Sequence, residues 1–138
     1  KEAKISNDFL VIARIESFIL GKRLEDAIKR AEAYSRAGAD AILIHSKDTD
    51  PKKIFSFAKK FSKSKFFKPL VSVPYSNSKT NEKNLIKNNF KIVIYANQLI
   101  RASYPAMVST AKSILYNKRS FEAQKKISSI NEIINLIK

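Results

Sequence analysis

Polar side chains follow several apolar runs of this sequence, at the point where each run ends. Arg14 follows the run 9–13, His45 and Ser46 follow the run 41–44, and Asn97 follows the run 92–96. Apolar residues on consecutive rather than alternate positions are typical of parallel strands buried on both faces. Parallel α/β folds place substrate-binding and catalytic groups at the carboxyl ends of their strands. We therefore predict that Arg14, His45 and Asn97 lie on one rim.

Each of these residues also has a simpler structural interpretation. Arg14 could form only an ion pair with Glu16, since the two lie two positions apart. A single histidine at the end of an apolar strand is more often a hydrogen-bonded core residue than a catalyst. Asn97 could merely cap the turn after its strand. Residue type and position alone leave both interpretations open.

The composition is that of one globular domain. The 138 residues are 44% hydrophobic and 28% charged, and no apolar stretch approaches the length of a membrane span. The absence of cysteine excludes a disulfide framework, a thiol nucleophile and thiolate metal sites, and it fits a cytoplasmic protein. A single histidine also excludes a metal site built from several histidines.

The net charge of +15 raises the question of a nucleic-acid or membrane partner. The cations are mostly lysines spread over the polar faces of helices, and no recognisable nucleic-acid-binding motif accompanies them. We therefore expect neither nucleic acid nor membrane as a partner. A positive field could still steer a small anionic substrate towards a site.

Helical periodicity alternates with the apolar runs. It predicts a helix over 24–34 that stops at Gly38, a second helix with Asp50 as N-cap and Pro51 at its first position, and a short third helix over 82–87. A fourth helix is predicted with Ser103 as N-cap and Pro105 in its first turn. Together with strands at 9–14, 41–45, 70–73 and 92–96, these helices make four strand–helix units.

The end of the sequence predicts one more helix. Ser129 and Glu132 have the spacing of a capping box, and isoleucines at 130, 133, 134 and 137 follow at helical spacing. An apolar helix left after the last strand–helix unit commonly packs on a neighbour, and in an oligomer that neighbour can be another subunit.

Four units are half of a closed (β/α)₈ barrel, which needs eight units and typically about 250 residues. Residues 1–7 resemble the end of a preceding helix followed by a turn. We predict an α/β fold in which residues 1–117 form the second half of such a barrel, residues 118–138 form a C-terminal extension with a closing helix, and the first half lies upstream.

Several segments resemble the phosphoenolpyruvate mutase branch of the isocitrate lyase superfamily. They occur in the family's order and cover nearly the whole sequence; they are residues 8–17, 27–33, 37–47, 69–74, 93–97, 101–107, 119–120 and 130–137. The resemblance implies an Mg²⁺-dependent (β/α)₈-barrel enzyme that rearranges phosphoenolpyruvate to phosphonopyruvate. It also implies a homodimer or homotetramer in which the last helix swaps between subunits.

The resemblance also implies roles for the residues at the strand ends. Arg14 matches the arginine that holds the phosphoryl group, for which a fixed charge and a planar fork of donors are suited. His45 matches a catalytic histidine at the transferring group or the enolate, Ser46 and Asn97 match further substrate-binding positions, and Glu16 matches a supporting position nearby. The Mg²⁺ ligands of the family belong to the first half of the barrel, so no metal ligand is expected in this chain.

The sequence departs from the family at a few positions. Gln98 follows Asn97 where histidine is common, Tyr75 stands where threonine is usual, and Asn88-Asn89 replaces a common glycine. Phosphonopyruvate hydrolase shares the His-Ser pair at the strand end and is the nearest alternative to a mutase. Another lyase of the superfamily, acting on a carbon–carbon or carbon–phosphorus bond, is a less well matched alternative. A non-catalytic half-barrel that acts as a scaffold or as the partner of a split gene is the alternative from another class.

Overall fold

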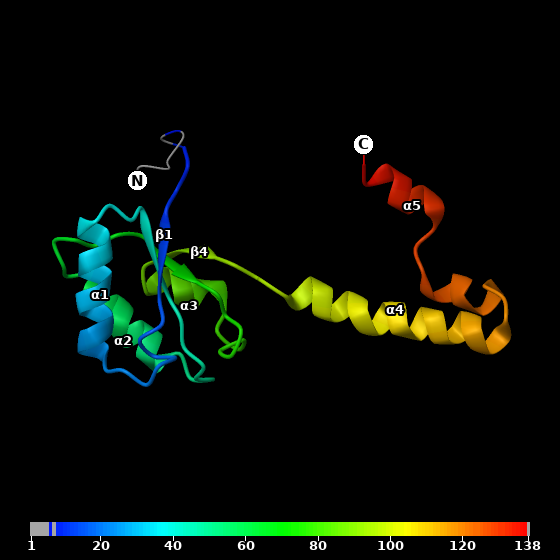
Figure 1. Ribbon diagram of the computed structural model, residues 1–138, viewed down its shortest axis with the longest axis horizontal. Helices are drawn as coiled ribbons and strands as arrows, with labels where there is room; N and C mark the ends of the chain where they lie inside the picture. Colours follow the sequence, from blue (N-terminus) through cyan, green and yellow to red (C-terminus); the bar gives the residue numbers. More distant parts are fainter. Residues whose placement is uncertain (1–5, 7, 138) are drawn as a thin grey trace. The chain divides into compact units, whose positions relative to one another are not determined.

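The computed structural model describes Ser6 and residues 8–137, and its elements follow one another as alternating strands and helices (Figure 1). The predicted helix end at residues 1–7 lies outside the described residues, apart from Ser6. The four strands are β1 (Ile12–Ile15), β2 (Ala41–Ile44), β3 (Leu70–Ser72) and β4 (Phe90–Val93). The helices are α1 (Leu24–Arg36), α2 (Lys52–Phe61), α3 (Glu82–Lys87), α4 (Gln98–Asn117) and α5 (Ile130–Asn135), with a 3₁₀ helix, η1, over Phe121–Lys126.

The four strands form one parallel sheet in the order β1-β2-β3-β4. Each strand is joined to the next by a helix, so neighbours in sequence are neighbours in the sheet. This is the arrangement predicted for four units of a (β/α)₈ barrel, and the predicted fold class is confirmed. The glycine stop is confirmed as well, because Gly38, two residues after the end of α1, has a φ of 101°, a conformation that costs glycine little.

The strands differ from the prediction mainly at their ends. β1 starts at Ile12 and not at residue 9, because its pairing with β2 begins at the Ile12–Ala41 pair, and Phe9 and Leu10 before it are exposed. β4 starts earlier than predicted, at Phe90, which pairs with Leu70. The register then shifts by one residue, so that Val71 pairs with Ile92.

The sheet has one face covered by helices. The larger apolar cluster lies between this face and α1–α3, and Figure 1 shows α1 and α2 side by side along it. Phe57 and Phe61 of α2 are fully buried and stack with ring centroids 5.5 Å apart. Burial of each such side chain contributes about 1.5–3 kcal/mol, so this cluster is the main stabilising core of the sheet.

The opposite face of the sheet carries a smaller apolar cluster. Its buried members are Ala41, Leu43 and Val71, with Val73 and Ile92 packed against them. Ile12 and Arg14 of β1 point to the same side, because side chains alternate along a strand, and both are exposed. Among the described residues up to Ala96, no helix packs over this face, which would line the interior of a barrel.

The start of α2 differs from the prediction by one residue. The residue that precedes the helix is Pro51, and not Asp50, which was expected as N-cap. The Asp50 carboxylate nevertheless accepts the backbone N–H of Lys52 at 2.9 Å. Asp50 therefore accepts one of the free N–H groups of the first turn, although it stands one residue before the N-cap position that Pro51 occupies.

Residues 97–137 form a compact unit separate from the unit that contains the sheet. Here α4 begins at Gln98, so the expected start at Ser103 is wrong, and Pro105 lies inside the helix. The Ser103 hydroxyl instead donates to the carbonyl of Ile100 at 3.0 Å. Pro105 lacks the N–H of one helical hydrogen bond, yet the helix continues on both sides of it. The division at residue 117 into barrel and extension remains a prediction.

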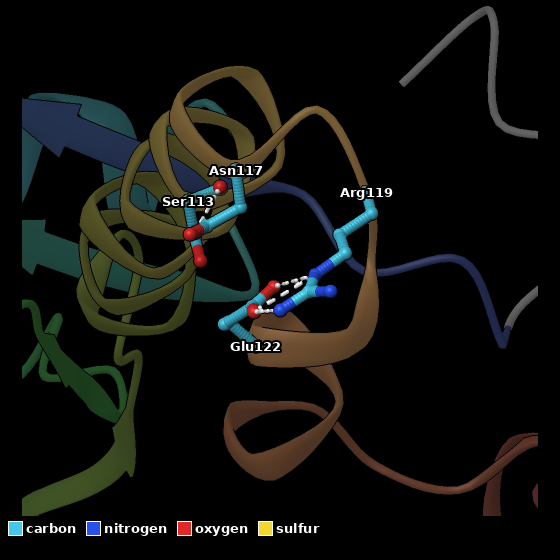
Figure 2. Close-up of polar contacts among 4 residues, drawn as sticks. All are labelled: Ser113, Asn117, Arg119 and Glu122. Atoms are coloured by element: carbon cyan, nitrogen blue, oxygen red, sulfur yellow. Dashed lines mark hydrogen bonds and ion pairs between the residues drawn. The ribbon is translucent and has the colours of Figure 1, made fainter.

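The capping box at α5 is confirmed. The Ser129 hydroxyl accepts the N–H of Glu132 at 3.2 Å, and the Glu132 carboxylate accepts the N–H of Ser129 at 2.8 Å. Between α4 and η1, Arg119 forms an ion pair with Glu122 of η1, and the Asn117 amide donates to the carbonyl of Ser113 (Figure 2). These contacts close the turn between α4 and η1.

Candidate functional site

Three polar side chains gather at the carboxyl ends of β1 and β2. Arg14 pairs in register with Leu43, and the next pair along the two strands is Ile15 with Ile44. Glu16 and His45 are the residues that directly follow this pair. Since side chains alternate along strands, Arg14, Glu16 and His45 share the face of the sheet that the helices leave uncovered. We call these three residues the strand-end cluster.

The ion pair predicted as a structural alternative is present within this cluster. The Nε atom of Arg14 donates to Oε1 of Glu16. Their side chains are 52% and 37% exposed, and exposed pairs of this kind contribute about 0–1 kcal/mol to stability. The pair is therefore a weak stabilising element, but it holds a guanidinium group at the rim of the sheet.

His45 is half-buried between its neighbours. Burial lowers the pKa of His45, the positive charge of Arg14 lowers this pKa further, and the carboxylate of Glu16 opposes both effects. The neutral imidazole is thus favoured near pH 7 more than in a free histidine. A neutral imidazole can donate a hydrogen bond from one nitrogen and accept one at the other.

Ser46 lies directly after His45 and shapes the loop that follows β2. Its hydroxyl accepts the backbone N–H of Asp48 at 3.1 Å, and Asp48 forms an ion pair with Lys53 of α2 at 2.9 Å. This ion pair is the main reason why the pKa of Asp48 is lowered. The Ser46 hydroxyl is thus engaged within its own loop, beside the strand-end cluster.

Asn97 opens the second compact unit and is the residue that precedes α4. Its side chain makes no capping hydrogen bond at the start of α4, so the alternative interpretation of Asn97 as a cap finds no support there. Its Oδ1 atom is buried and has no hydrogen-bond partner among the described residues. A role of Asn97 in binding substrate remains a prediction.

Tyr95, near the end of the fourth unit, is held in place by the neighbouring helix. Its hydroxyl donates to Oε1 of Glu82, the first residue of α3, at 2.8 Å, and this contact raises the pKa of Tyr95. A tyrosine whose pKa is raised by a carboxylate is a poor proton donor, so Tyr95 is better suited to a place at the exposed rim than to proton transfer.

One buried polar contact next to the cluster was missed from the sequence. Ser17 follows Glu16, is only 1% exposed, and donates from its hydroxyl to Oδ2 of Asp26 at 2.7 Å. The sequence does not indicate that Ser17 is buried, because a serine in a turn after a strand is usually exposed. Only Asp26, in the first turn of the predicted helix, could have suggested an acceptor.

Comparison with known proteins decides the family. A family model described as phosphoenolpyruvate phosphomutase matches residues 1–115. The chain belongs to the phosphoenolpyruvate phosphomutase family. A curated phosphoenolpyruvate phosphomutase of Tetrahymena pyriformis is 38% identical over 136 residues, which are 99% of this chain and 44% of that protein.

Solved structures of the family share the fold. A phosphoenolpyruvate phosphomutase from Streptomyces platensis subsp. rosaceus has a TM-score of 0.89 at 35% identity, over 98% of this chain and 46% of the other. A phosphonopyruvate hydrolase in complex with oxalate and Mg²⁺ has a TM-score of 0.87 at 37% identity, over 98% of this chain and 47% of the other. The chain therefore spans less than half the length of these family members, and identity alone does not separate a mutase from a hydrolase.

The described residues lack a cluster of metal ligands. Within residue 6 and residues 8–137, no group of three or more histidine, aspartate or glutamate side chains lies close enough to hold a metal ion. Mg²⁺ prefers carboxylate and water oxygens in octahedral geometry, and the strand-end cluster offers one carboxylate, already paired with Arg14. The described residues thus do not fit a magnesium site.

Among the same residues, no helix is long and apolar enough to cross a membrane.

Proposed function

We propose that this chain forms part of an enzyme that interconverts phosphoenolpyruvate and phosphonopyruvate, an isomerase that makes or breaks a carbon–phosphorus bond. The observation that supports this proposal is the strand-end cluster of Arg14, Glu16 and His45, found at the carboxyl ends of parallel strands in a chain of the phosphoenolpyruvate phosphomutase family. Cytoplasmic location and the absence of a nucleic-acid partner are part of the same proposal.

In this proposal Arg14 binds the phosphoryl group. Its permanent charge and its fork of N–H donors suit an anionic group that must be held while its bond to the enol oxygen breaks and its bond to the methylene carbon forms. Glu16 already fixes the Nε side of the guanidinium, so the Nη donors are the ones that would meet the phosphoryl oxygens. Glu16 thus orients Arg14 without touching the substrate.

His45 acts as the catalytic donor in this proposal. Oxygen of the pyruvyl part gains negative charge once the phosphoryl group leaves it, and a donor aimed at that oxygen stabilises the charge. Burial and Arg14 lower the pKa of His45, so the neutral ring can donate without giving up its proton. Ser46 and Asn97 complete the proposed set of substrate-binding residues.

Mg²⁺ is the proposed cofactor, and it would supply charge neutralisation at the substrate oxygens. The described residues do not fit a magnesium site, so its ligands would belong to the part of the barrel that this chain does not contain. Accordingly, we also propose the first half of a (β/α)₈ barrel as a partner of the uncovered sheet face.

The second compact unit supports a homodimer or homotetramer formed by swapping of the last helix. Among the described residues neither α4 nor α5 has a buried residue, although both are rich in large apolar side chains. Leu99 and Tyr116 are 86% and 88% exposed. An apolar groove of about 500 Å³ lies between α4 and the segment before and within α5, lined among others by Met107, Ile114 and Ile133. Exposed apolar side chains gathered around a groove are typical of subunit interfaces.

Phosphonopyruvate hydrolase is the second candidate, because the hydrolase structure is as similar to this chain as the mutases are. Incubating the full-length protein with phosphonopyruvate and Mg²⁺, and following phosphorus by NMR, separates the candidates. We expect phosphoenolpyruvate to form. Inorganic phosphate with pyruvate would identify a hydrolase, and no turnover by a folded protein would favour the non-catalytic half-barrel.

A further inference from the structure

We infer that Ser17 and Asp26 form a positioning pair that fixes the carboxyl end of β1, and thereby holds Glu16 against Arg14 and beside His45. The inference deepens the proposed function, on which it rests for the importance of the strand-end cluster. Neither residue would touch substrate. Both act through the backbone that carries Glu16.

The contacts of Ser17 connect the strand end to the first turn of α1. The Ser17 hydroxyl donates to Oδ2 of Asp26 at 2.7 Å, and the same oxygen accepts from Nε of Arg30, one turn later, at 2.9 Å. The hydrogen bond from Ser17 is the main reason why the pKa of Asp26 is lowered, and Arg30 adds to it. A buried serine therefore meets a carboxylate that is itself held in place.

The backbone around Ser17 tightens the same turn. The carbonyl of Ser17 accepts the N–H of Lys22 at 2.8 Å, and the carbonyl of Glu16 accepts the N–H of Leu20 at 3.0 Å. Gly21 closes the turn with a φ of 67°, a conformation that glycine adopts without strain. The hydroxyl and the carbonyl of Ser17 thus tie it both to α1 and to the end of its own loop.

Glu16 depends on this anchor because β1 lies at an edge of the described sheet. Within the described residues β1 pairs with β2 alone, and the pairing ends at Ile15 with Ile44. Glu16 is the first residue beyond it, and its side chain is 37% exposed. Without the bond from Ser17 to Asp26, the carboxylate could leave Arg14, and the charge of Arg14 would act on His45 unopposed.

The test measures the pKa of His45 by NMR, and the histidine signal that is lost in His45→Gln identifies the His45 resonance. The charged groups that act on His45 are Arg14 and Glu16, of which Arg14 lowers its pKa and Glu16 raises it. We expect Ser17→Ala to lower the pKa of His45 further, and Ser17→Thr, which keeps the hydroxyl, to restore it. In a Glu16→Gln background, Ser17→Ala should have no additional effect.

Ser64→Ala is the matched control. The Ser64 hydroxyl donates to Oε1 of Glu32 at 2.7 Å, a serine–carboxylate bond to the same helix at a place remote in sequence from β1. We expect this variant to leave the pKa of His45 at the wild-type value. Should Ser17→Ala not fold, Asp26→Ala removes the acceptor from a partly exposed position and must lower the pKa of His45 in the same way.

An unchanged pKa of His45 in a folded Ser17→Ala or Asp26→Ala variant would overturn the inference. So would an effect of Ser17→Ala that persists in full with Glu16→Gln, because Ser17 would then not act through Glu16. The titration needs no substrate, so its result is independent of turnover. A protein that does not convert phosphonopyruvate but shows the expected coupling would refute the proposed function and keep the positioning pair.

Discussion

Val11 and Asp40 bind each other reciprocally at the start of β1. The Asp40 carboxylate accepts the N–H of Val11 at 2.9 Å, and the N–H of Asp40 donates to the carbonyl of Val11 at 2.8 Å. The two residues directly precede the first register pair, Ile12 with Ala41. This contact therefore fixes the register of β1 against β2. The same register places Glu16 beside His45, one residue beyond the last pair of the two strands.

Replacing Asp40 should destabilise the sheet. Loss of a hydrogen bond to a charged group costs about 1.5–3 kcal/mol, and we expect Asp40→Ala to lower the free energy of unfolding by about that amount in urea titrations. Asp50→Ala is the control, because its carboxylate accepts the Lys52 N–H at a helix start, where a lost cap costs about 1 kcal/mol. Equal losses in the two variants would contradict a special role for Asp40.

Replacing Arg14 should impair the proposed reaction far more than it impairs stability. Because the Arg14–Glu16 pair is exposed, we expect Arg14→Gln to change the free energy of unfolding by less than about 1 kcal/mol. Loss of the phosphoryl-binding guanidinium should lower kcat/KM for phosphonopyruvate by about 100-fold or more, as loss of a single donor to developing charge does elsewhere. The measurement is steady-state kinetics of the full-length protein.

Arg119→Gln provides the comparison for Arg14→Gln. Arg119 also pairs with a nearby glutamate, Glu122, and is similarly exposed, but it lies in the second compact unit (Figure 2). We expect the kcat/KM of Arg119→Gln to stay within about twofold of wild type, which corresponds to about 0.4 kcal/mol in the activation barrier. Equal losses in both variants would mean that Arg14 contributes only general charge.

The lowered pKa of His45 predicts how stability depends on pH. The unfolded chain binds a proton at His45 below about pH 6.5, whereas the folded protein resists protonation until a lower pH. In that window the unfolded state holds more protons, so stability falls as pH falls. We expect His45→Gln to lose less stability than wild type between about pH 7.5 and about pH 5.5 in urea titrations. An identical loss in both would show that burial does not shift the pKa of His45.

The sequence predicted those parts of the site whose positions are set by strand pairing and by the alternation of side chains along a strand. Consecutive apolar residues before Arg14 and His45 indicated two parallel strands. Neighbouring parallel strands end at the same edge of a sheet, so the sequence predicted that these two residues lie close together, as they do. The ion pair between Arg14 and Glu16 followed in the same way, from alternation along one strand. Register, and not side-chain chemistry, carried these predictions.

What the sequence did not predict depends on contacts between segments. Ser17 is buried because α1 folds back over the turn, and a serine next to a glutamate gives no sign of that. The start of α4 was misplaced because Pro105 was treated as a first-turn residue, although a helix can carry a proline in its interior. That Asn97 Oδ1 is buried without a hydrogen-bond partner among the described residues was not predicted either.

The exposed apolar residues of the second unit predict an oligomer that a few charges can dissociate. Leu115 and Leu136 are 77% and 79% exposed, so a glutamate at either position is tolerated by the isolated unit but would be desolvated in an interface. We expect Leu115→Glu combined with Leu136→Glu to convert the protein to a monomer in light scattering after size exclusion. Gln124→Glu, which adds charge at an exposed polar position of η1, should leave the wild-type mass. A wild-type protein that is monomeric at micromolar concentration would refute the proposed helix swap, and so would a double variant that keeps the oligomeric mass.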